Sequence, residues 1–65
     1  MYIFKTEIPI KIKQIEACKI IGLTQPTLSK ILNGKVACRK VVAFSITKYI
    51  DETAEINDFF YKKGE

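Results

Sequence analysis

One glycine and its neighbours constrain the fold of this chain more than any other feature. Gly22 lies between two short apolar helical patterns in the run KQIEACKIIGLTQPTLSKILNGK, residues 13–35. Glycine adopts a positive φ without steric cost, so it suits the corner where a first helix ends. Thr24 then provides an N-cap, its hydroxyl expected to accept from a free helix amide, and Pro26 falls in the first turn, where no N–H is needed. The pattern predicts a helix-turn-helix.

The second helix of this motif is predicted to begin at Gln25 and to end at the pair Asn33-Gly34, which permits a left-handed turn. Three apolar residues recur at helical spacing and form the stripe that we expect to be buried: Leu28, Ile31 and Leu32. The remaining side chains of this helix are polar or basic, and none is acidic.

The first helix of the motif is predicted to begin near residues 11–13 and to end at Ile21. We expect it to bury Ile15, Cys18 and Ile21, with Ala17 close against the second helix.

The residues of this motif resemble those of a known family. The matching positions are Gln14, Ala17, Cys18 and the run from Gly22 to Lys35, GLTQPTLSKILNGK. They resemble the helix-turn-helix of the lambda Cro and repressor-like DNA-binding family, also called XRE. Cys18 stands four residues before the turn glycine, where alanine is usual. The family normally has a further helix ahead of the motif, and the preceding residues here lack a helical pattern.

The resemblance implies a mainly α fold, a small four-helix helix-turn-helix domain of the lambda-repressor-like type. It also implies a repressor, as in the small Cro-like proteins of phages, plasmids and other mobile elements. We expect one domain over residues 1–65, with a strand or arm at 1–11, the motif at 13–34 and C-terminal helices at 38–62.

Residues 2–12 alternate between apolar and polar side chains, which is the period of a β-strand. Pro9 restricts such a strand to an edge or to an early end. An isolated strand is unstable, and the rest of the chain shows no second strand pattern. The segment therefore either packs on the helices as an extended arm or pairs with the same strand of a second copy, and we favour the second.

The C-terminal part of the chain predicts two more helices. The third helix is expected to begin near Cys38 and to bury residues on more than one side, among them Val41 and either Ala43 or Phe44. A last helix, residues 53–62, is expected to be capped by Asp51 or Thr53. Its inward residues are Ile56, Phe59 and Phe60, and a dimer contact there is the alternative to strand pairing.

A chain of 65 residues forms a marginal core, which self-association would relieve. At 48% apolar it is too apolar for disorder, and it has no uninterrupted apolar run of membrane-spanning length. Its N-terminus lacks the pattern of a secretion signal, so we expect a cytoplasmic protein. We expect Cys18 and Cys38 to be free thiols. With no histidine and no ligand spacing, we expect no metal and no cofactor.

Charge is distributed unevenly along the chain. Residues 1–40 carry eight cations and two glutamates, a net charge of +6, whereas residues 41–65 carry three lysines and five acids, a net charge of −2. A basic surface that includes the motif is typical of a protein that binds a polyanion, although solvated lysines without a role are the alternative.

These features favour a sequence-specific regulator that binds double-stranded DNA as a homodimer and is not an enzyme. Ser29 has no histidine partner for catalysis, and no phosphate-binding glycine loop is present. Gln25 and Lys30 are expected to contact base edges in the major groove. Pro26 is also expected to contact DNA. The remaining expected residues mostly position the motif on phosphates: Gln14, Thr24, Thr27, Ser29, Asn33, Lys35, Arg39 and Lys40. The alternative is a protein-interaction module on the same fold, such as an antitoxin, antirepressor or inhibitor.

Overall fold

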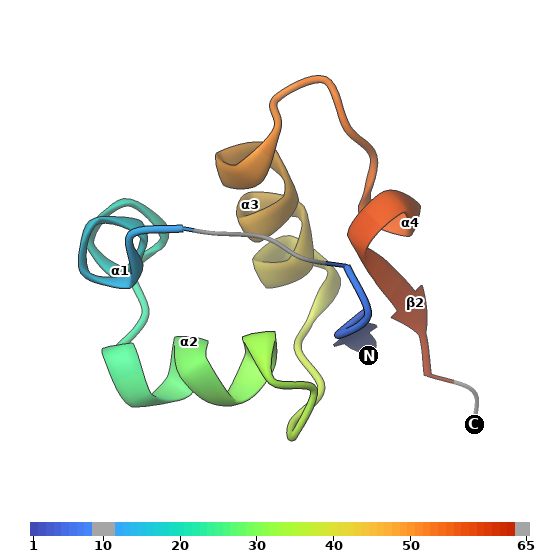
Figure 1. Ribbon diagram of the computed structural model, residues 1–65, viewed down its shortest axis with the longest axis horizontal. Helices are drawn as coiled ribbons and strands as arrows, with labels where there is room; N and C mark the ends of the chain where they lie inside the picture. Colours follow the sequence, from blue (N-terminus) through green and yellow to red (C-terminus); the bar gives the residue numbers. More distant parts are fainter. Residues whose placement is uncertain (9–11, 64–65) are drawn as a thin grey trace.

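The computed structural model describes residues 1–8 and 12–63, and these residues form four helices and a two-stranded sheet (Figure 1). The helices are α1 (Gln14–Ile21), α2 (Gln25–Leu32), α3 (Lys40–Ile50) and α4 (Ile56–Phe59). The strands are β1 (Tyr2–Phe4) and β2 (Phe60–Lys62), which bring the two ends of the chain together. The predicted mainly helical class is confirmed.

The predicted corner between α1 and α2 is confirmed at the backbone. Gly22 has a φ of 88°, and its amide donates to the Cys18 carbonyl at 2.8 Å. Thr24 is the N-cap of α2, but the expected role of its hydroxyl is wrong. The hydroxyl donates to Thr27 Oγ1 at 2.8 Å and does not cap a backbone amide. The helix ends as predicted, with Gly34 at a φ of 71°.

The core lies where α1, α2, α3 and the sheet meet. Its buried apolar side chains come from every part of the described chain: Phe4, Ala17, Leu28, Ile31, Cys38, Ala43, Ile46, Ala54 and Phe60. The predicted stripe of α2 is confirmed, with Leu28 and Ile31 buried and Leu32 half-buried against the core. Burial of this stripe holds α2 in place and leaves its opposite side in solvent.

The predicted phase of α1 is wrong at one residue. Ala17 is fully buried as expected, and Cys18 and Ile21 pack partly against the core. Ile15, however, is 63% exposed. Two residues along an α-helix correspond to about 200° of rotation, so a helix that turns Ala17 inward must turn Ile15 outward.

The predicted N-terminal strand is much shorter than expected, and it has a partner within the chain. Pro9, Ile10 and Lys11 lie outside the described residues. β1 pairs antiparallel with β2, with Phe4 opposite Phe60, so the expectation that the chain offers no second strand is wrong. On its other edge, the Tyr2 amide donates to the Cys38 carbonyl at 2.7 Å, and the Cys38 amide donates back at 2.8 Å. Pairing with a second copy is therefore blocked at Tyr2 on both edges.

The predicted helix over residues 53–62 is also wrong. α4 has four residues, and the chain then extends into β2 so that the Phe60 ring packs edge-on against Phe4, with centroids 5.2 Å apart. The cap of α4 is a reciprocal pair between Glu55 and Asp58, in place of the expected Asp51 or Thr53. Phe60 is fully buried within the monomer, which removes it as a dimer contact.

α3 lies across the centre of the fold and buries one side only. Ala43, Ile46 and Thr47 face the core, and the Thr47 hydroxyl donates to the Ala43 carbonyl at 2.8 Å. Val41 is 75% exposed and Phe44 is 51% exposed, so the expected burial on more than one side is wrong. None of the helices in the described part of the chain has the length and apolar character to cross a membrane.

Candidate nucleic-acid interface

α2 turns a polar side to solvent along its whole length. Four of its residues are exposed and Ser29 is half-buried, while Leu28 and Ile31 hold the opposite side in the core. The exposed residues are Gln25, Pro26, Thr27 and Lys30. No residue of this helix is acidic. Such a surface offers hydrogen-bond donors and a positive charge without an anion that would repel phosphate.

Two side-chain pairs order this polar side. At the N-terminus of α2, the Thr24 hydroxyl donates to Thr27 Oγ1 at 2.8 Å. At the C-terminal end of α2, Nδ2 of the C-cap residue Asn33 donates to Ser29 Oγ at 3.4 Å. Each pair spans three or four residues, the spacing that brings side chains together on a helix. The pairs restrain four of the residues that the sequence indicated as phosphate contacts.

Gln14 and Gln25 line one open hollow, although they lie eleven positions apart in the chain. Each is the first residue of its helix, α1 or α2, and the turn at Gly22 brings these two N-termini side by side. The hollow has a volume of about 510 Å³, and its full lining is Lys13, Gln14, Ile15, Glu16, Lys19 and Gln25. We refer to it as the Gln25 hollow. It is too open to enclose a small molecule, which pockets normally surround on most sides.

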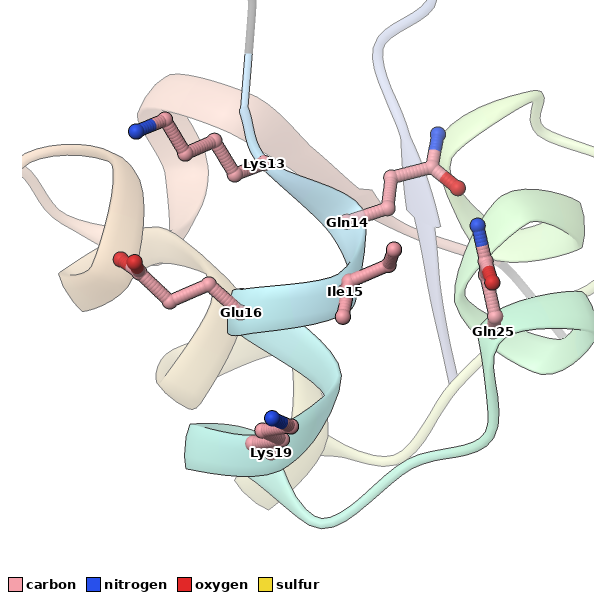
Figure 2. A pocket seen from close by; sticks show the side chains of 6 residues that line it. All are labelled: Lys13, Gln14, Ile15, Glu16, Lys19 and Gln25. Carbon is pink, nitrogen blue, oxygen red and sulfur yellow. The ribbon is translucent and has the colours of Figure 1, made fainter.

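The side chains of the Gln25 hollow divide into two directions. In Figure 2, Gln14 and Ile15 point toward Gln25, whereas Lys13 and Glu16 point to the opposite side. The Glu16 carboxylate accepts a hydrogen bond from the Tyr49 hydroxyl at 3.0 Å. Partial burial, and then this hydrogen bond, raise the pKa of Tyr49. The one acid of the hollow is thus turned toward α3 and away from Gln25.

The basic residues expected after α2 do not form one cluster with the Gln25 hollow. Lys35 is exposed in the turn that follows α2, and Arg39 is exposed at the N-cap of α3. Lys40 is exposed too, but it lines a separate hollow with Tyr2 and residues 55–57. Of these three residues, Lys35 lies closest to the end of α2 along the chain, and Lys40 lies against residues 55–57.

Sequence reasoning missed three residues of this surface. Lys13 and Lys19 were counted in the net charge and were not assigned to a site, and Ile15 was assigned to the core. The sequence permits two phases for α1, because Ala17 and Ile21 lie about one helical turn apart and so do Ile15 and Cys18. A short helix leaves its phase ambiguous, and here the smaller residue faces inward.

No family model matches the chain, and no curated protein or solved structure matches it significantly.

Proposed function

We propose that this protein is a sequence-specific transcriptional regulator that inserts α2 into the major groove of double-stranded DNA. The observation that carries the proposal is the outer side of α2: exposed, polar, free of acidic residues and held in place by a buried stripe. An α-helix fits the width of the major groove of B-form DNA. The resemblance of residues 14–35 to the XRE helix-turn-helix supports the same function, a lambda-repressor-like fold and a cytoplasmic repressor.

Gln25 and Lys30 are the proposed base-reading residues. In helix-turn-helix proteins, the N-terminal residues of the second helix contact base edges, and Gln25 is the first residue of α2. The glutamine amide pairs bidentately with adenine N6 and N7, and lysine donates to guanine O6 and N7. Lys30 lies one and a half turns further along and is exposed.

Phosphate contacts are proposed for the residues that flank these two. Gln14 is the first residue of α1, where free backbone amides and the helix dipole attract an anion. Thr24, Thr27, Ser29 and Asn33 present their hydroxyl and amide groups along α2. Lys35 and Arg39 add positive charge beyond its end, with Lys40 acting at longer range because of its position beside residues 55–57.

We further propose that the protein binds as a two-fold dimer, which would place two α2 helices about 34 Å apart, one turn of DNA. Because β1 and Phe60 are engaged within the monomer, neither provides the contact. Sedimentation at tens of micromolar, with and without an operator, tests this part. A monomer under both conditions would contradict it.

The function itself is tested by binding to a random pool of DNA duplexes, followed by rounds of selection. We expect binding that weakens steeply as salt rises, because each neutralised phosphate releases counterions, and selected duplexes that share a common sequence. If the protein does not bind duplex DNA at low salt, the proposal is wrong, and the protein-interaction module becomes the better hypothesis.

A further inference from the structure

Ile15 is an apolar side chain on a surface where the proposed function needs DNA contacts. It is 63% exposed, and it points toward Gln25 across the Gln25 hollow (Figure 2). Single exposed isoleucines are common on protein surfaces, so exposure alone indicates nothing. The position is informative, because Ile15 adjoins the residue that we propose reads adenine.

In the described part of the chain, Ile15 is the one apolar side chain in the lining of the Gln25 hollow. Among the described residues that line the Gln25 hollow, the other five are glutamines, lysines and a glutamate. Glu16 is hydrogen-bonded to Tyr49 on the far side, whereas Gln14 and Ile15 point toward Gln25. Two amides and one aliphatic side chain therefore face the same space.

An A·T pair presents a matching set of groups in the major groove. Adenine offers N6 and N7, which a glutamine amide recognises, and thymine offers O4 and a 5-methyl group. The methyl group is the only apolar group on any base edge there, and it is recognised by apolar contact. Cytosine and uracil lack it, so such a contact distinguishes thymine from either.

We propose that Ile15 is a specificity-determining residue that contacts the 5-methyl group of a thymine at, or one step from, the base pair read by Gln25. The inference rests on the proposed DNA-binding function. It adds that the protein recognises a thymine at the Gln25 hollow. The preferred half-site then contains a thymine whose methyl group, and not only its hydrogen-bonding pattern, contributes to affinity.

The test removes that methyl group from the DNA. In the selected operator, each thymine is replaced singly by deoxyuridine, which differs only by the methyl group, and affinity is measured for wild type and for Ile15→Ala. One replacement should weaken wild-type binding about fourfold, as expected for one small apolar group returned to water. The same replacement should have almost no effect on Ile15→Ala, because the contact is already lost.

Ile20 provides a matched control on the same helix. It is 65% exposed, nearly the same as Ile15, but it does not line the Gln25 hollow. Ile20→Ala should keep the full response to deoxyuridine, and Ile15→Val should keep most of it. Because both isoleucines are exposed, both alanine variants should unfold near the wild-type temperature.

Three results would overturn the inference: no deoxyuridine replacement weakens wild type, Ile15→Ala responds as wild type does, or Ile20→Ala loses the response equally. Any of these in a protein that still binds its operator with base preference refutes the Ile15 contact alone. Absence of base-preferring DNA binding by wild type refutes the proposed function together with this contact.

Discussion

A side chain at Gly34 would collide with Thr6. A Cβ placed on Gly34 would lie 2.9 Å from Thr6 Cγ2 and 3.7 Å from the Phe4 carbonyl oxygen, whereas a Cβ on Gly22 would meet no atom within 4 Å. Both glycines have a positive φ. The turn after α2 therefore packs against the N-terminal segment, and the corner before α2 does not.

The two glycines should differ in their response to alanine. Gly22→Ala should lower the free energy of unfolding by roughly 1 kcal/mol, because only the positive φ opposes it. Gly34→Ala should cost about 1 kcal/mol more, because overpacking against Thr6 adds to the strain. Urea denaturation followed by circular dichroism measures both. In a Thr6→Ser background the extra cost should disappear, and equal costs for the two glycines in wild type would refute the contact.

Pairing of β1 with β2 predicts unequal roles for two adjacent aromatic residues. Phe60 is fully buried against Phe4, while Tyr61 is 50% exposed on the same strand. Phe60→Leu should lower the free energy of unfolding by about 1–2 kcal/mol through lost ring contact and imperfect packing. Tyr61→Leu should change it by less than about 0.5 kcal/mol. Similar midpoints of urea unfolding for the two variants would mean that Phe60 does not pack as described.

The stability of the fold should depend on pH through Asp51. Its carboxylate accepts hydrogen bonds from Thr53 Oγ1 at 2.7 Å and from the Thr53 amide at 3.0 Å, and these bonds hold the pKa of Asp51 below its ordinary value. A carboxyl whose pKa is lower in the folded state stabilises the fold above its unfolded pKa of about 4. That stabilisation is lost as pH falls through the lower, folded-state pKa.

An NMR titration of the Asp51 carboxyl should therefore find a lowered pKa in wild type and a value nearer to normal in Thr53→Val, which removes the hydroxyl donor. In Asp51→Asn, the loss of stability at low pH that Asp51 causes should disappear, as measured by urea unfolding at several pH values. A pKa at or above the ordinary value in wild type would contradict the turn geometry.

The cysteines should differ in reactivity. Cys38 is buried beside β1, and burial raises the pKa of its thiol, whereas Cys18 is half-buried on α1. The thiolate is the reactive form, so iodoacetamide near pH 8 should modify Cys18 first. Peptide mass spectrometry measures both rates, with the urea-unfolded protein as the control in which the rates converge. Faster modification of native Cys38 would contradict its burial.

The local features of this fold were predictable from the sequence, and the features formed by distant residues were not. Gly22, Thr24 and Pro26 mark the corner and the start of α2 through backbone chemistry that depends on near neighbours only. The pairing of Phe4 with Phe60 joins opposite ends of the chain, and three-residue strands have too little pattern to indicate it.

The errors in the C-terminal helices have a similar origin. Ile56 and Phe59 have helical spacing, which favoured a longer helix. Phe60 instead adopts an extended backbone, because its ring packs against Phe4 when β2 pairs with β1. Val41 and Phe44 are apolar, which favours burial, yet no part of the described chain covers that side of α3 fully. Ile15 was misassigned because an eight-residue helix does not fix its own phase.

The central claim is that α2 reads DNA bases through Gln25. The most direct measurement is the ratio of affinities for the selected operator and for random duplex, in wild type and in Gln25→Ala, with Arg39→Ala as the control. The account predicts that Gln25→Ala loses about 1–3 kcal/mol on the operator, relaxes preference at one base position and changes random binding much less. Arg39→Ala should weaken both affinities about equally and reduce the salt slope by about one. A Gln25→Ala protein with an unchanged ratio and unchanged base preference would contradict the claim.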